Sequence, residues 1–433
     1  MQHIEIWALI PFILMLLSIA IMPLVAESWW EKNIHKLWVA IGLSLPASLY
    51  LISNNMQELL IHQILMDYLP FIILLGALFI VTGGIQILGD FQALPSVNTT
   101  ILVVGYCLAS LIGTTGAAML LIHPLLRVNK HRKYKTHTVL FFIALVANCG
   151  GILTPLGDPP LFLLYLRGAD FTWFLNLLPE WAFTGAFLLI TYYLTDKYLY
   201  NKREDLANLM ADLRERTTIR FKGKFNIILL VGIILSVLLL NPAHFPQMKS
   251  ENAPIYWKFL REISLITIAV ISLLATNQQV RRDNHFKWEP ITEVAVIFIG
   301  IFITMTPALE FLSQNAARLG IDKPWQFFYA SGTLSAFLDN SPTAVAFHTV
   351  AQALPTATGT TIEAGVNQLI LQAISLGSVF FGAMTYIGNG PNFMVKAIAE
   401  QEGVKMPDFF GYMLRFSLII LLPIYIIVQL IFL

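Results

Sequence analysis

Long apolar stretches separated by short polar segments run along the whole chain. They cover residues 6–25, 37–53, 68–89, 99–126, 137–166, 171–196, 225–241, 259–277, 291–313, 325–353, 365–395 and 408–432. A helix needs about 20 residues to cross the apolar core of a bilayer. The pattern therefore predicts an all-α integral membrane protein. No Lys or Arg precedes the first stretch, which is also longer than the apolar region of a signal peptide, so we expect it to be the first crossing.

The composition agrees with a membrane protein and excludes several other classes. Hydrophobic residues make up 57% of the 433 residues and charged residues 12%, about half the charged fraction of soluble domains. The 27 basic and 26 acidic residues nearly balance, so no excess charge favours nucleic acid as a partner. Cys107 and Cys149 lie in apolar runs without zinc-ligand spacing, and we expect two packed, inert thiols. No nucleotide-binding loop and no resident cofactor are predicted.

The orientation follows from the basic segments, because Lys and Arg near span ends stay cytoplasmic. Segments 127–135, 197–224 and 281–287 carry sixteen of the 27 basic residues, whereas segment 54–67 carries none. We therefore expect the three basic segments inside, 54–67 outside, and both termini outside. The expected location is a bacterial inner membrane, where membrane lipid contacts the outer faces of the helices.

This orientation requires that two apolar segments enter and leave the membrane on the same side. They are 99–126, with Gly113-Thr114-Thr115-Gly116 at its centre, and 325–353, with Asp339-Asn340-Ser341-Pro342 at its centre. Glycine tolerates the turn conformation, and a polar tip at membrane depth needs protein or water around it. Both segments are predicted to be re-entrant helical hairpins.

The two halves of the chain align with each other. Residues 111–120 align with 337–346, and residues 150–162 align with 381–393. The matched pairs are Gly113 with Asp339, Thr114 with Asn340, Thr154 with Thr385, Gly157 with Gly388, Asp158 with Asn389 and Pro160 with Pro391. Because the first half starts outside and the second inside, we expect two inverted repeats, each with five transmembrane helices and one re-entrant hairpin.

The expected boundaries follow from this alignment. The first repeat covers 1–196, with its hairpin at 99–126 and a broken helix at 137–166. The second covers 225–433, with its hairpin at 325–353 and a broken helix at 365–395. Residues 197–224 form a cytoplasmic linker, in which Leu206, Leu209, Met210 and Leu213 recur at the spacing of an amphipathic helix.

Both interrupted helices contain residues that break a helix. These are Pro155, Gly157, Pro159 and Pro160 in the first, and Gly388, Gly390 and Pro391 in the second. Proline removes a donor and clashes with the carbonyl one turn earlier. Inverted repeats with broken helices place the substrate site at the bilayer midplane, where helix ends and free carbonyls become ligands.

Asp158 and Asp339 are the candidate centre of this site. A carboxylate at the middle of a membrane helix costs about 2.5–3.5 kcal/mol on insertion scales, so acids there are usually functional. The alternative is a pair of protonated or hydrogen-bonded acids that fix helix packing. Further oxygen ligands for sodium are expected from Asn340, Ser341, Thr154, Thr385, Asn389, Thr114, Thr115 and, as a neighbour or a packing amide, Asn148. Oxygen donors suit a hard cation.

Burial also disfavours the charged form of a carboxyl group, and two nearby acids disfavour it further. A proton and a sodium ion would then compete for the same carboxylates, which is sufficient for antiport.

Other ionisable residues are weaker candidates. We expect Glu180, Glu293 and Glu310 near span ends to be interfacial anchors. His123 and His348 are expected to pack rather than to relay protons.

These motifs resemble a known superfamily. VANCGGILTPLGDPPLF, residues 146–162, is similar to the Asn-x-Gly-Gly-x-x-Thr-x-Ile-Gly-Asp pattern of NhaD-type sodium/proton antiporters, with Leu156 in place of Ile. FLDNSPTAVAF, residues 337–347, resembles their Asp-Asn hairpin. Pro159-Pro160 is more similar to the melanosomal P protein and citrate-transporter-like branches of the same ion transporter superfamily. The resemblance implies a homodimer, a static scaffold of outer spans, and an elevator-type transport domain built from the hairpins and broken helices.

The leading hypothesis is secondary transport that exchanges sodium or lithium for protons, with Asp158 and Asp339 alternately protonated and metal-bound. The alternative is sodium-coupled import of a di- or tricarboxylate or another anion. Dicarboxylate symporters carry Ser-Asn-Thr at both hairpin tips, which this chain lacks, and Asp339 would repel an anion. An intramembrane aspartyl protease is disfavoured, because Pro155-Leu156-Gly157-Asp158 departs from Gly-x-Gly-Asp and proteolysis leaves the internal symmetry unexplained. We expect no enzyme activity.

Overall fold

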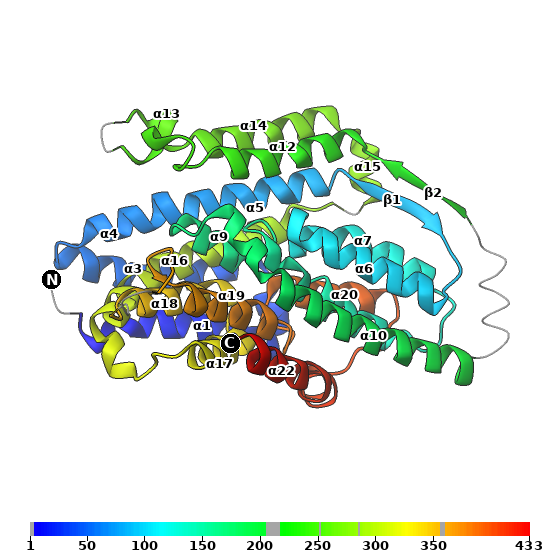
Figure 1. The fold of residues 1–433 in the computed structure, drawn as a ribbon. Coiled ribbons are helices and arrows are strands. Elements are labelled where there is room, and N and C mark those ends of the chain that lie inside the picture. The colour runs from blue at the N-terminus through cyan, green and yellow to red at the C-terminus, as the bar shows by residue number, and fades with distance from the viewer. Residues whose placement is uncertain (1–3, 205–216, 251–252, 285, 356–359) are drawn as a thin grey trace.

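The computed structural model describes residues 4–204, 217–250, 253–284, 286–355 and 360–433, and these are mostly helical (Figure 1). The predicted amphipathic helix around Leu206–Leu213 lies outside the described residues. The described residues also form two short antiparallel sheets of two strands each. The predicted all-α membrane class is thus confirmed in its main feature.

The elements of the first part of the chain follow the expected apolar stretches. They are η1 (Ile6–Leu9), α1 (Ile10–Val25), α2 (Glu27–Trp30), α3 (Asn33–Ser53), α4 (Gln57–His62), the π-helical η2 (Gln63–Tyr68), α5 (Leu69–Thr82), β1 (Gln86–Asp90), α6 (Pro95–Ile112), α7 (Thr114–Val128), α8 (Thr136–Leu145), η3 (Cys149–Leu153), α9 (Pro159–Leu166), η4 (Phe171–Leu177) and α10 (Leu178–Lys202).

The remaining elements begin with a strand that pairs with β1. They are β2 (Thr217–Lys222), α12 (Phe225–Leu239), η5 (Pro246–Lys249), α13 (Ile255–Lys258), α14 (Leu260–Ala275), α15 (Gln278–Asp283), α16 (Glu289–Asn315), η6 (Ala316–Leu319), α17 (Pro324–Phe337), α18 (Asn340–Gln352), β3 (Ile362–Glu363), β4 (Val366–Asn367), α19 (Gln368–Gly382), α20 (Gly390–Gln401), α21 (Phe409–Tyr412), the π-helical η7 (Met413–Leu421) and α22 (Leu422–Phe432).

Eight helical segments of the described residues are long and apolar enough to cross a membrane. They are Ile6–Pro23, Asn33–Ser53, Gln57–Thr82, Pro95–Ile112, Thr136–Leu153, Phe171–Lys202, Glu289–Leu319 and Phe409–Phe432. The apolar helices Thr114–Val128, Phe225–Leu239 and Gln368–Gly382 are shorter. Two of these shorter helices adjoin a turn or a break in the chain: Thr114–Val128 follows the turn at Gly113, and Gln368–Gly382 precedes the break before Gly390.

The apolar stretch 68–89 ends differently from its prediction. Its helix α5 stops at Thr82, and Gln86–Asp90 form β1, which pairs antiparallel with β2 in the register Gln86 with Lys222. The helix stops at Gly83-Gly84, where side-chain amides take over the free carbonyls: Asn226 Nδ2 donates to Gly84 O at 3.0 Å and Asn284 Nδ2 to Gly83 O at 3.2 Å. Contacts with residues far along the chain thus accompany the end of the helix, although the apolar pattern continues to residue 89.

The helices form two packed groups that meet at α5, α16 and η2. In the first group α1, α3 and α16 pack together, and α12 and α14 pack on each other and on α5. Figure 1 shows α12 and α14 side by side along one edge of the molecule. In the second group α6 packs on α7 and η3, α18 on α9, and α17 on α19. The second group holds both hairpins and both broken helices.

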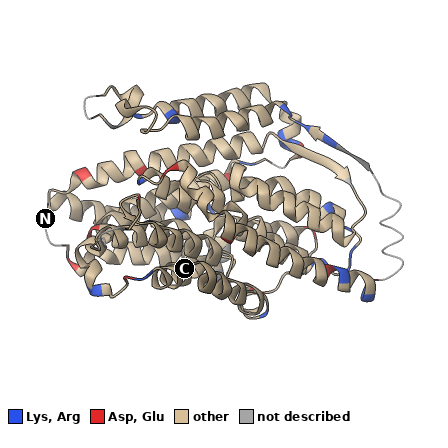
Figure 2. Cartoon of the chain, in the orientation of Figure 1, with Lys and Arg blue, Asp and Glu red and all other residues tan. Residues whose placement is uncertain are grey.

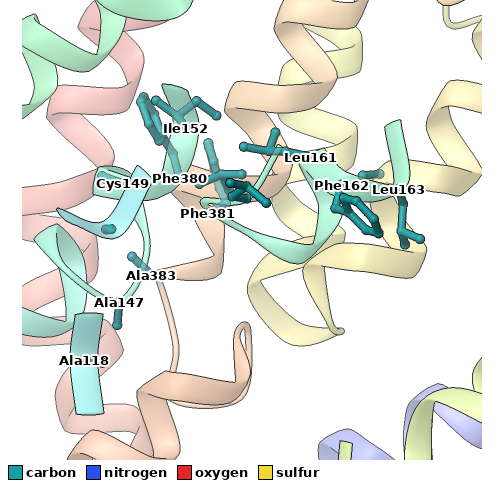
Figure 3. Close-up of a cluster of buried hydrophobic side chains, with 14 of the residues drawn as sticks. Ala118, Ala147, Cys149, Ile152, Leu161, Phe162, Leu163, Phe380, Phe381 and Ala383 are labelled. Atoms are coloured by element: carbon teal, nitrogen blue, oxygen red, sulfur yellow. The ribbon is translucent and has the colours of Figure 1, made fainter. Parts of the chain in front are cut away.

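The core of the second group lies around the interrupted helices (Figure 3). Ala147, Cys149, Ile152 and Phe380 are fully buried there. Cys149 is packed as expected, but Cys107 is exposed, because it lies on the outer face of α6 with Val103 and Val104. The prediction of two packed thiols was therefore wrong for Cys107.

A buried charge cluster joins α10 to the segment between α7 and α8. Arg132 lies between Asp196, at 2.6 Å, and Glu204, at 2.9 Å, and these side chains are at most 2% exposed. His137 Nε2 is 3.0 Å from Asp196. Asn98 Nδ2 also donates to Asp196 at 3.2 Å. The cluster fixes one end of the second group.

We expect Asp196→Ala to lower the free energy of unfolding by about 3–5 kcal/mol, because it leaves a buried guanidinium short of its counter-charge. The matched control is Asp283→Ala, which removes the partly exposed pair with Lys222 and should cost about 0–1 kcal/mol. Denaturant unfolding in detergent micelles measures both. Equal losses in the two variants would contradict a stabilising role for the cluster.

Candidate functional site

Two interrupted helices supply the central residues of the candidate site. The first continues from α8 through η3 to Thr154, and α9 begins at Pro159 directly after Asp158. The second continues from α19 to Gly382, and α20 begins at Gly390 directly after Asn389. Asp158 (φ −146°, ψ 143°) and Asn389 (φ −150°, ψ 139°) share the same extended backbone. Pro155, Gly157 and Gly388 lie within the breaks, while Pro159, Pro160, Gly390 and Pro391 open the following helices.

The two hairpin tips reach these breaks. Gly113 joins α6 to α7 with φ +81°, a conformation that favours glycine. Thr114 N then donates to Gly157 O at 2.7 Å, which ties the first tip to the first break. At the second tip, the side chain of Asp339 caps α18 by accepting from Ser341 N at 2.9 Å.

Four separate segments meet at the carboxylate of Asp158, which is 1% exposed. Its Oδ1 accepts from Thr114 Oγ1 at 2.7 Å, and its Oδ2 accepts from Asn340 Nδ2 at 2.6 Å. Asn389 Nδ2 donates to Oδ1 at 3.1 Å. The donors come from the first hairpin, the second hairpin and the second break. All three are neutral, and no salt bridge to Asp158 occurs among the described residues.

A chain of asparagine amides extends this site. Asn389 Nδ2 also donates to Asn148 Oδ1 at 3.2 Å, and Asn148 Nδ2 donates to Asn392 Oδ1 at 2.7 Å. Asn392 Nδ2 in turn donates to Thr385 O at 2.9 Å. Asn392 was missed in the sequence. The sequence did contain a signal, because Asn392 aligns with the apolar Leu161 of the first half. An amide that is fully buried at such a position needs a polar partner.

The other predicted ligands make different contacts. Thr154 donates its hydroxyl to Ser110 O, and Thr385 donates to Ala336 O at 2.5 Å, so both bind hairpin backbone. Ser341 Oγ donates to Asn340 Oδ1 at 3.3 Å. Asp339 makes its side-chain contact with its own helix. The structure therefore brings Asp158 together with Thr114, Asn340, Asn389 and Asn148, and places Thr154, Thr385, Ser341 and Asp339 around this centre.

A cavity of about 70 Å³ borders the first tip. Its lining includes Gly113, Thr114, Thr115, Leu156 and Pro159 from the second group of helices, and Leu75, Leu78, Phe79, Pro290, Ile291 and Val294 from α5 and α16. Pockets for small organic ligands are usually about 300–1,000 Å³. The cavity is therefore too small for a ligand of that size in this conformation. No group of three or more His, Cys, Asp or Glu that could hold a metal ion occurs in the described part of the chain.

The ionisable residues near span ends divide into two kinds. Glu293 pairs with Lys36 at 2.6 Å and is 42% exposed, and Glu310 accepts from Gln314 at 2.9 Å. Glu180, by contrast, is 3% exposed, and its Oε1 accepts from Gln372 Nε2 of α19 at 2.5 Å. The expectation of an interfacial anchor was wrong for Glu180. His348 is fully buried and its Nε2 contacts Ala364 O at 3.1 Å, as a packing histidine does.

The comparisons with known proteins assign the chain to a transport family. A family model described as "Putative citrate transport" matches all of residues 1–433. No curated protein gives a significant match. The chain belongs to this family, which agrees with the ion transporter superfamily, and it is an integral membrane protein.

The breaks depend on glycines that allow close backbone contact. A Cβ on Gly157 would overlap with the carbonyl oxygen of Gly151, whereas a Cβ on Gly390 would meet nothing within 4 Å. We expect Gly157→Ala to lower the free energy of unfolding by at least about 1–3 kcal/mol, the usual cost of overpacking. Gly390→Ala is the matched control and should be neutral or slightly stabilising. Thermal unfolding in detergent compares them, and equal midpoints would show that the close contact is unimportant.

Proposed function

We propose that this chain, as a member of the citrate-transport family, is a secondary active transporter that exchanges sodium or lithium for protons at Asp158. The single observation that supports this is the buried carboxylate of Asp158, which accepts from three neutral donors and, among the described residues, from no Lys or Arg. A carboxylate in that setting retains a net negative charge that a cation can neutralise. Either a proton or an alkali metal ion supplies that charge.

The neighbours of Asp158 can serve both occupied states. A hydroxyl such as that of Thr114 can donate to the carboxylate or accept from its protonated form, and an asparagine amide can present its oxygen or its nitrogen. With sodium bound, the amides of Asn340 and Asn389 would turn their oxygens toward the ion, which prefers oxygen ligands. Asp339 lies at the second tip and would contribute a second negative charge to the same region.

We also propose that residues 1–196 and 225–433 are inverted repeats, each with five transmembrane helices and one re-entrant hairpin, joined by 197–224. Matching contacts support this. The Thr154–Ser110 and Thr385–Ala336 bonds join equivalent positions of the two halves. Leu156 N donates to Thr154 Oγ1 and Ile387 N donates to Thr385 Oγ1, both at 3.2 Å.

An elevator-type movement of the second group of helices against the first would carry the site across the membrane. The proposal is supported by the separation of the two groups, since the hairpins and broken helices pack mostly on one another. An ion pair crosses between the groups: Arg167 at the end of α9 contacts Asp67 of η2 at 3.1 Å. Arg167 also donates to Thr349 of α18 at 3.3 Å.

The orientation of the molecule follows from its basic residues. Figure 2 shows Lys and Arg at the end that carries β1, β2 and the last turns of α10. We propose that this end is cytoplasmic and that both termini are outside. A homodimer in a bacterial inner membrane remains a prediction from the family resemblance.

Sodium-coupled transport of citrate or a related carboxylate is the second candidate, favoured by the family match. The electrostatics of the site support it less well. A tricarboxylate needs cationic or N–H donors, but Pro159 and Pro160 remove two N–H groups from the start of α9, and Pro391 removes one from α20.

We expect Asp158→Asn and Asp339→Asn each to abolish sodium-triggered proton movement in everted vesicles, because each removes a titratable charge. Asparagine can still cap α18 at position 339, so that variant separates charge from capping. Asp170→Asn, at an exposed loop position, is the control and should keep full activity. Full activity in Asp158→Asn would exclude the proposed exchange.

Labelled citrate separates the two candidate functions. For cation exchange, we expect no sodium-dependent citrate uptake into vesicles that show sodium-triggered proton movement. Sodium-dependent uptake that Asp158→Asn removes would establish the second candidate instead.

The Arg167–Asp67 pair offers a test of the elevator. Because the pair is mostly buried, Asp67→Asn or Arg167→Gln should destabilise this conformation relative to its alternative and change the exchange rate on the order of tenfold, the effect of about 1.4 kcal/mol. Combining Asp67→Arg with Arg167→Asp should restore part of the lost coupling. A double variant no closer to the wild type than the single ones would argue against this link.

A further inference from the structure

A second cavity, of about 190 Å³, lies at the end of the molecule that carries β1 and β2 (Figure 1). It is smaller than the usual pocket for a drug-sized ligand, about 300–1,000 Å³, and its size suits a small polyatomic ion. The elements around it are in contact, since α7 packs on β1 and on α20, and β1 packs on α15. The lining comes from α7, the segment between α7 and α8, β1, the end of α15 and the residue after α20.

Cationic side chains outnumber acidic ones in this lining. One of the two acids, Asp283, is already paired, because its Oδ2 lies 3.1 Å from Lys222 Nζ. The lining therefore carries a net positive charge, which attracts anions. The cations are Arg127, Lys130 and Lys135, and the acids are Asp283 and Glu402.

Two of these cations are suited to hold an oxyanion. Arg127 is exposed, and its guanidinium makes no ion pair within the described part of the chain. A guanidinium binds phosphate or carboxylate oxygens through two parallel N–H groups. Lys135 is half-buried. Burial lowers the pKa of Lys135, and the carboxylate of Glu402 opposes that shift. A bound anion would favour the charged form of Lys135 further.

A buried amide in the same lining also lacks a partner. Gln86 of β1 is 6% exposed, and its Oε1 is buried without a hydrogen-bond partner among the residues that the structure describes. Polar atoms without a partner are uncommon in protein interiors. An amide can accept through its oxygen or donate through its nitrogen. Inorganic phosphate at neutral pH carries both charged oxygens and an O–H group, so it can bind the basic residues and either end of this amide.

We propose that this cavity is a binding site for free phosphate on the cytoplasmic side, held by Arg127, Lys135 and Gln86. The basic residues at this end of the molecule (Figure 2) support the cytoplasmic assignment. Arg127 and Lys130 are exposed, so the site is open to the solvent there.

The site lies between the two groups of helices. Arg127 belongs to α7 of the second group, whereas Gln86 belongs to β1, which continues from α5 of the first group. A phosphate ion bound to both would hold the groups together in this conformation and slow their relative movement. This consequence rests on the proposed function, whereas the binding site itself does not.

Binding of radiolabelled inorganic phosphate to the purified protein tests the site without transport. Sodium and ionic strength are held constant in a scintillation proximity assay. We expect saturable binding that Arg127→Gln, Lys135→Gln and Gln86→Leu each weaken by about tenfold, equivalent to 1.4 kcal/mol. Arg282→Gln is the matched control and should bind as the wild type does, because Arg282 is an exposed arginine of α15 outside the lining.

Glu402→Gln should strengthen phosphate binding, because it removes the negative charge that acts on Lys135. A damaged fold would not produce that gain. The proposal is overturned if the wild type shows no saturable binding, or if the Arg127, Lys135 and Gln86 variants bind as Arg282→Gln does. Displacement of the label by phosphatidylglycerol but not by phosphatidylcholine would assign the site to a lipid headgroup and overturn its assignment to the free ion.

Everted vesicles expose the cytoplasmic side and test the consequence for transport. Phosphate added outside should slow sodium-triggered proton movement in the wild type, and Arg127→Gln should need about tenfold more phosphate for the same effect. Saturable binding without slowing would overturn the inhibitory role. Absence of proton movement in the wild type would instead contradict the proposed exchange, and it would leave the binding result unaffected.

Discussion

The carboxylate of Asp158 has to be satisfied inside an apolar helix bundle, and much of the surrounding structure follows from that requirement. A buried charge needs several hydrogen bonds with good geometry. No single helix supplies them, because a continuous helix uses its own backbone groups internally. Thr114, Asn340 and Asn389 reach the carboxylate only because two hairpins and a second interrupted helix end at the same place. The interrupted helices are therefore the condition for a charge at this depth.

The same requirement explains the residues that interrupt the helices. Pro159 and Pro160 open α9 without N–H groups that would need partners, and Gly157 permits close backbone contact with Gly151. Thr154 and Thr385 then bind carbonyls at the ends of the neighbouring hairpin arms, replacing bonds that a continuous helix would make. Proline, glycine and threonine thus determine the backbone conformation at the breaks. The asparagines donate hydrogen bonds to the carboxylate.

Local signals explain what could be predicted from the sequence. Proline and glycine act on their own backbone, so the interruptions and the first hairpin turn were visible as residue patterns. The contacts between amides were not, because the partners Asn148 and Asn392 lie far apart in the chain. Strand β1 was missed since its pairing with β2 is also a tertiary event. Glu180 was misplaced because it follows Pro179 near the start of a helix, whereas the residue that binds it, Gln372, lies 192 residues away in the chain.

The two interruptions differ most at the position where their chemistry would matter. Asp158 and Asn389 have the same backbone conformation and face each other, yet only Asp158 can carry charge. Two aspartates there would repel strongly in a medium of low dielectric constant, and two asparagines would leave no group to titrate. One acid paired with one amide gives a carboxylate with a built-in donor. This asymmetry within the proposed repeats favours a single exchangeable positive charge at the centre. Asp339 lies at the second hairpin tip, where its side chain caps its own helix.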